Sequence, residues 1–177
     1  MQVDQVNQTI QQAIIYKRQW KIKQALAIET VCMKRCIQEN DTTVMGVAML
    51  FKALGKLYCL TNELGKAELH FAAGIETFAK AFQEENNRDI KNICEEQMYT
   101  CAYHLGRWHN WTHGSKLSSF FRQIQLSFRI QPDPGGADSS IEINKFTHLG
   151  MEIYQQMVIQ QKGQSISSYL MTEYMAG

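Results

Sequence analysis

The most constraining feature of this sequence is where it places proline. Only two prolines occur in 177 residues, Pro132 and Pro134, and both lie in the segment QPDPGGADSS. Because proline removes a backbone donor and breaks helices, a chain that confines it to one segment can form long helices elsewhere. Outside the proline segment, apolar residues recur at helical spacing. No stretch shows the sustained alternation of apolar and polar residues that is typical of strands. The sequence therefore predicts an all-α protein.

Breaks and capping residues divide the chain into about eight helices, in four successive antiparallel helix–turn–helix pairs. Side-chain oxygens in ENDTT (39–43) can accept the first amide protons of the third helix, and Asp89 is a candidate cap for the fifth. We expect the fifth helix to end near Trp108, where HNWTHGS turns the chain.

The proline segment also predicts how the chain is divided. Helical hairpins are expected over residues 1–131, and a Pro/Gly linker loop over 132–139. Residues 140–177 are expected to form a C-terminal helical hairpin that packs on the same array.

A Leu-Gly dipeptide recurs late in the first helix of three of these pairs. It occurs at Leu54-Gly55, Leu105-Gly106 and Leu149-Gly150. A glycine inside a helix costs about 1 kcal/mol relative to alanine. Its recurrence indicates that a partner helix approaches closely at each of these points.

These dipeptides carry a resemblance to the tetratricopeptide repeat family, whose units follow W-x2-L-G-x2-Y, then A-x3-F, then proline. The best unit is FKALGKLY…KAELHFAAGIETF, which supplies Phe51, Leu54, Gly55, Tyr58, Ala67 and Phe71. The units around AYHLGRW and FTHLGMEI match in part, at spacings longer than the family's repeat of about 34 residues. The resemblance implies a right-handed α-solenoid whose concave surface binds a peptide or protein.

Several residues are candidates for contact with such a partner. Lys56 and Arg107 follow two of the repeated glycines, where the family's carboxylate-gripping members carry asparagine. We expect both to act as donors to an acidic segment of a partner. Trp108 and Trp111 are expected to close the neighbouring hairpin corner and to contribute to the same surface.

The C-terminal helix is a second candidate surface. It carries apolar residues where a terminal capping helix should be polar outside, among them Tyr169, Leu170 and Tyr174. We expect this helix to dock on another chain or to complete a homodimer.

Charge argues against nucleic acid as the main partner. Eighteen Lys and Arg balance seventeen Asp and Glu, which gives a formal net charge of +1 and no strong field. One basic cluster leaves an RNA-binding helical repeat as an alternative; it comprises Lys17, Arg18, Lys21 and Lys23.

Histidines and a cysteine gather around HLGRWHNWTHG (104–114) and leave a second alternative. Imidazole and thiolate groups suit zinc, and the candidate ligands are Cys101, His104, His109 and His113. Their spacing matches no zinc signature, so this small all-α metal-dependent regulator or enzyme ranks second. No phosphate loop, dinucleotide fingerprint or nucleophile elbow occurs, and we expect no catalysis and no cofactor.

Disulfide frameworks need an oxidising compartment, and the five cysteines are odd in number and scattered. We therefore expect a reducing, intracellular setting, the cytoplasm. No secretory leader is evident, and no apolar run is long enough to insert in a membrane. The sequence therefore predicts a non-catalytic protein–protein interaction module, an adaptor or a structural subunit of a larger complex.

Overall fold

The computed structural model describes residues 3–40, 42–113 and 140–177, and within these ranges the chain is helical with no strand. The all-α prediction is confirmed. The described elements are α1 (Val3–Arg18), α2 (Ile22–Glu39), α3 (Val44–Leu60), α4 (Leu64–Glu84), α5 (Arg88–His113), α7 (Ser140–Gln160) and α8 (Ile166–Ala176). The helix expected before Pro132 and the Pro/Gly linker over 132–139 lie outside the described residues.

Side-chain caps fix several helix starts. The Thr43 hydroxyl accepts a hydrogen bond from the Gly46 amide at 3.2 Å and caps α3, as ENDTT predicts. At α5 the cap is Asn87, whose side-chain oxygen accepts from the Asp89 amide at 2.9 Å. The expected cap, Asp89, instead lies in the first turn of the helix.

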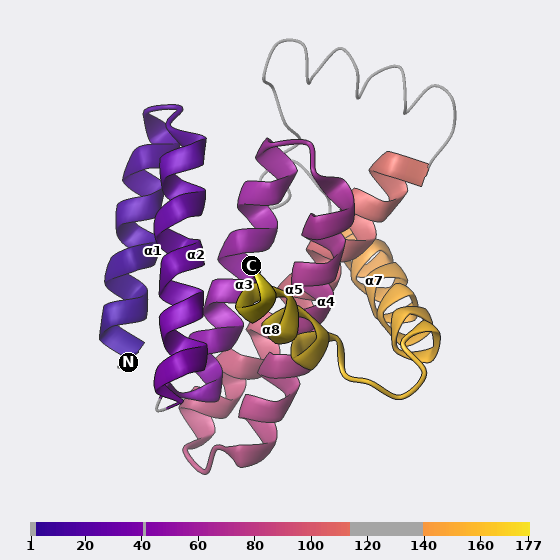
Figure 1. The fold of residues 1–177 in the computed structure, drawn as a ribbon. Coiled ribbons are helices and arrows are strands. Elements are labelled where there is room, and N and C mark those ends of the chain that lie inside the picture. The colour runs from indigo at the N-terminus through magenta and orange to yellow at the C-terminus, as the bar shows by residue number, and fades with distance from the viewer. Residues whose placement is uncertain (1–2, 41, 114–139) are drawn as a thin grey trace.

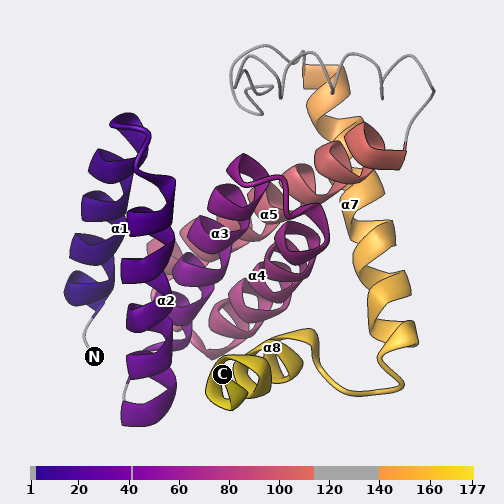
Figure 2. The ribbon, with the colours of Figure 1, turned by 45° about the horizontal axis from the view of Figure 1, so that its top comes forward.

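The helices follow one another across the molecule (Figure 1). α1 and α2 lie side by side at one end, α3, α4 and α5 occupy the middle, and α7 lies at the other end (Figure 2). The most extensive packing joins α3 to α4, α4 to α5 and α5 to α7. Large side chains from the middle helices fill the core, including Phe51, Leu54, Phe71, Phe78 and Leu105.

The end of the chain differs from the expected C-terminal hairpin. α7 packs on α5, whereas α8 crosses back to pack on α4 and α2 (Figure 2). Glu76 of α4 holds the start of α8, because its carboxylate accepts hydrogen bonds from the Ile166 and Ser167 amides, both at 3.1 Å. Ile166 and Leu170 are buried by this packing.

The recurring glycines have the packing role that the sequence predicts. A Cβ added to Gly106 would overlap the Phe146 carbonyl oxygen, and one added to Gly150 would overlap the Ala102 carbonyl oxygen. α5 and α7 therefore touch backbone to backbone, and we call this the α5–α7 glycine contact. At Gly55 the neighbour is a side chain, since an added Cβ would lie 2.7 Å from the Phe71 ring.

Candidate functional site

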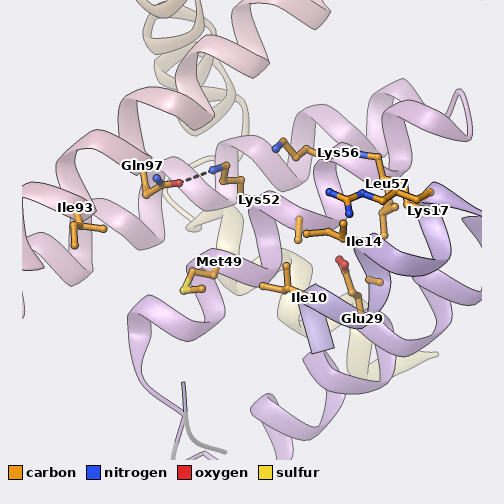
Figure 3. Close-up of a pocket in the computed structure, with 13 residues that line it drawn as sticks. Ile10, Ile14, Lys17, Glu29, Met49, Lys52, Lys56, Leu57, Ile93 and Gln97 are labelled. Carbon is orange, nitrogen blue, oxygen red and sulfur yellow. Dashed lines mark hydrogen bonds between the residues drawn. The ribbon is translucent and has the colours of Figure 1, made fainter. Parts of the chain in front are cut away.

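A pocket of about 520 Å³ opens between α1, α2, α3 and α5 (Figure 3). We call it the basic pocket. Its apolar lining comes from Ile10, Ala13, Ile14, Met49, Ala53, Leu57 and Ile93. Its polar lining comes from Lys17, Arg18, Glu29, Lys52, Lys56 and Gln97.

The cations of the basic pocket come from two helices, α1 and α3. Lys17 and Arg18 end α1, while Lys52 and Lys56 stand one turn apart on α3 and so share a face. The Lys52 ammonium donates a hydrogen bond to the Gln97 side-chain oxygen at 2.5 Å, which ties α3 to α5 (Figure 3). Burial, together with the charge of Lys56, lowers the pKa of Lys52. These four basic side chains give the pocket a predominantly positive polar lining.

Glu29 of α2 is the one acidic residue among the described lining residues. It is only 2% exposed, and its Oε1 has no hydrogen-bond partner among the described residues. Burial raises its pKa to about 8, against the opposing effect of the Lys17 charge. At neutral pH, therefore, most Glu29 side chains are protonated and can donate a hydrogen bond.

The structure separates the residues expected to bind an acidic partner. Lys56 is exposed and lines the basic pocket. Arg107 does not line it; its guanidinium carbon lies 5.7 Å from the centre of the Phe146 ring of α7. Trp108 is only 4% exposed, and Trp111 packs partly buried against the core. Trp108 is therefore a core residue, and a contact of Trp111 with a partner stays a prediction.

The residues of α8 that were expected to dock on a second chain contact other helices of this chain. Leu170 is buried, and Tyr169 is partly buried against the same core. The Tyr174 hydroxyl lies 2.6 Å from the His70 Nε2 on α4. The apolar side of α8 that includes Leu170 therefore packs on α4 and α2 of its own chain. Docking of this helix on a second chain stays a prediction.

The cysteine and histidines of the zinc alternative lie along α5, not in a turn, because α5 continues to His113. Cys101 packs against Gly74, and the His104 ring stacks on Phe71 with centroids 5.1 Å apart. Burial lowers the pKa of His104 to about 3 and raises that of Cys101 to about 12. His109 turns to Glu68, with its Nδ1 3.4 Å from Oε1. The described part of the chain contains no group of three such side chains placed to hold a metal, and the His113 side chain lies outside it.

The basic cluster of the RNA alternative is divided by the structure. Lys17 and Arg18 line the basic pocket, whereas Lys21 and Lys23 do not. Sequence reasoning missed Lys52 and Glu29. A signal for Glu29 was present, because it falls on the buried stripe of α2, in helical register with Ala25, Cys32, Met33 and Cys36.

No protein-family model matches the chain, and no curated protein or solved structure matches it either. None of the described helices is both long and apolar enough to cross a membrane.

Proposed function

We propose that the protein is a non-catalytic helical-repeat adaptor that binds an acidic segment of a partner protein in the basic pocket. The observation that carries this proposal is the set of four cations around an apolar lining: Lys17, Arg18, Lys52 and Lys56. Carboxylates of the partner would pair with these cations, while aliphatic side chains between them would enter the apolar part.

The position of the basic pocket supports a tetratricopeptide-like interpretation. Its lining comes mainly from α1, α3 and α5, the first helices of the successive pairs. In helical solenoids these stacked elements form the concave surface that binds partners.

We place this binding inside the cell. All five cysteines lie in the described part of the chain, all are buried, and none forms a disulfide. That use of cysteine fits a reducing compartment.

Selection from a random 12-residue peptide library displayed on yeast tests the proposal. The wild-type protein should enrich peptides that combine Asp or Glu with aliphatic residues. Reversing two pocket charges, with Lys52→Glu and Lys56→Glu, should weaken binding of an enriched peptide by at least about tenfold, because attraction becomes repulsion.

The matched control reverses two charges outside the basic pocket, with Lys21→Glu and Lys23→Glu. Both residues are exposed, and both belong to the same basic stretch of sequence. This control should bind like the wild type. The proposal is wrong if the wild type enriches no acidic sequence, or if both double variants lose binding equally.

A further inference from the structure

Glu29 stands apart from every other group that lines the basic pocket. It reaches the pocket from α2, and its carboxyl is directed toward the α1 side chains around Ile14 (Figure 3). A buried polar atom without a partner costs about 1–3 kcal/mol. The Lys17 charge acts against the cost of burying an ionised Glu29, but no group of the described chain forms a hydrogen bond with Oε1. A bound ligand that supplies the missing partner would offset that cost.

The groups around Glu29 determine what that partner can be. Lys17 faces it from α1, and Tyr174 approaches it from α8. Lys52 and Lys56 stand across the pocket on α3. These positive charges disfavour a cation or a ligand ammonium group and favour a carboxylate. Burial keeps Tyr174 neutral by raising its pKa.

We propose that Glu29 is the specificity-determining residue of the basic pocket, and that its protonated carboxyl donates a hydrogen bond to a carboxylate of the acidic segment. This inference rests on the proposed function. An O–H donor paired with a carboxylate makes one of the stronger hydrogen bonds in proteins. Ionised Glu29 would instead repel the same carboxylate. Binding therefore depends on the proton that Glu29 holds.

The pH dependence of binding follows from this arrangement. The pKa of Glu29 is about 8, so the protonated, binding-competent form is depleted as pH rises above 8. If only that form binds, affinity falls roughly 30-fold by pH 9.5. Burial also lowers the pKa of Lys52, so the charge of Lys52 adds a pH dependence of its own. That contribution is shared by variants at position 29, so comparison with them isolates Glu29.

The probe is a fluorescein-labelled peptide of sequence ELEELLEELLEE, with binding measured by fluorescence anisotropy between pH 6.5 and 9.5. Glu29→Gln keeps a donor but cannot ionise, so it should bind within about threefold of wild type at pH 6.5 and lose most of the decline above pH 8. Glu29→Leu removes the donor and should bind about tenfold more weakly at every pH.

The control is Glu95→Gln, which removes an exposed carboxylate of α5 outside the basic pocket; it should follow the wild-type curve. Circular dichroism at each pH establishes that every variant is folded. If the wild type binds the peptide but Glu29→Gln keeps the full decline, the role of Glu29 is overturned and the proposed function stands. If the wild type does not bind at pH 6.5, both are overturned.

Discussion

Two faces of α5 differ in how completely they are packed. On the α7 side, Gly106 and Gly150 bring two backbones together with no room for even a methyl group. On the α1 and α3 side, Ile93 and Gln97 border a pocket of about 520 Å³ that contains a buried carboxyl without a partner. The first face contributes stability, and we propose that the second binds a ligand. We therefore expect substitutions on the two faces to affect different measurements.

The largest effect is expected at the α5–α7 glycine contact. Gly106→Ala or Gly150→Ala places a methyl group on a backbone carbonyl oxygen that cannot move alone, so α5 and α7 must separate. We expect the free energy of unfolding, measured with urea, to fall by about 3 kcal/mol or more.

Gly65→Ala is the matched control for these variants. Gly65 lies near the start of α4, and an added Cβ would meet nothing within 4 Å. This variant should be neutral or up to about 1 kcal/mol more stable, because alanine favours helix. Equal losses at Gly65 and Gly106 would contradict the distinction between close contact and helix propensity.

The next effect is acid sensitivity of the packed middle of the molecule. Burial lowers the pKa of His104 to about 3 and that of His70 to about 4, both below the ordinary value of 6.5. The unfolded chain therefore binds more protons, and stability falls as pH drops from 6.5 through 4 to 3. His104→Phe keeps a ring against Phe71 and removes one protonation site. Between pH 7 and pH 4.5, the free energy of unfolding of this variant should fall by roughly 2 kcal/mol less than that of the wild type. If the free energy of unfolding falls equally for variant and wild type between pH 7 and pH 4.5, protonation of His104 is not the cause of the acid sensitivity.

An effect of similar size and opposite sign is expected at the basic pocket. The pKa of Glu29 is raised from 4.5 to about 8, so the folded protein binds the extra proton and stability falls as pH rises through that range. Glu29→Gln removes this loss. Its free energy of unfolding should exceed that of wild type by roughly 2 kcal/mol at pH 8 and change little at pH 5. A Glu29→Gln variant that is less stable than wild type at pH 8 would show that Glu29 stabilises the fold at this pH and does not weaken it.

Local signals determined much of the fold. Confinement of both prolines to 132–134 predicts long helices elsewhere, and ENDTT (39–43) predicts a capping residue before α3. Both predictions are confirmed for the described residues, with Thr43 as the cap. The recurrence of Leu-Gly predicts close approach, because a glycine that weakens a helix needs a packing reason. The close neighbours of Gly55, Gly106 and Gly150 agree with it.

Other features depended on contacts that are distant in sequence. HNWTHGS (109–115) was expected to turn the chain, but it contains no proline and no glycine before residue 114. α5, which packs on α7, therefore continues to His113. Whether the apolar residues of α8 face a partner or their own chain depends on Glu76 and His70, which lie about 90 and 104 residues away along the chain. Sequence periodicity gives the apolar face of a helix but not what covers it.

Local backbone preferences fix where most of the described helices begin and end, so these features can be predicted from the sequence. Glycines inside helices mark where another helix approaches closely. Which charges act together depends on tertiary packing. It joined Lys17 and Arg18 to Lys52 and Lys56, left Lys21, Lys23 and Arg107 outside, and placed Glu29 beneath them. Burial and proximity set the charge state of a side chain, and both arise only when distant helices pack.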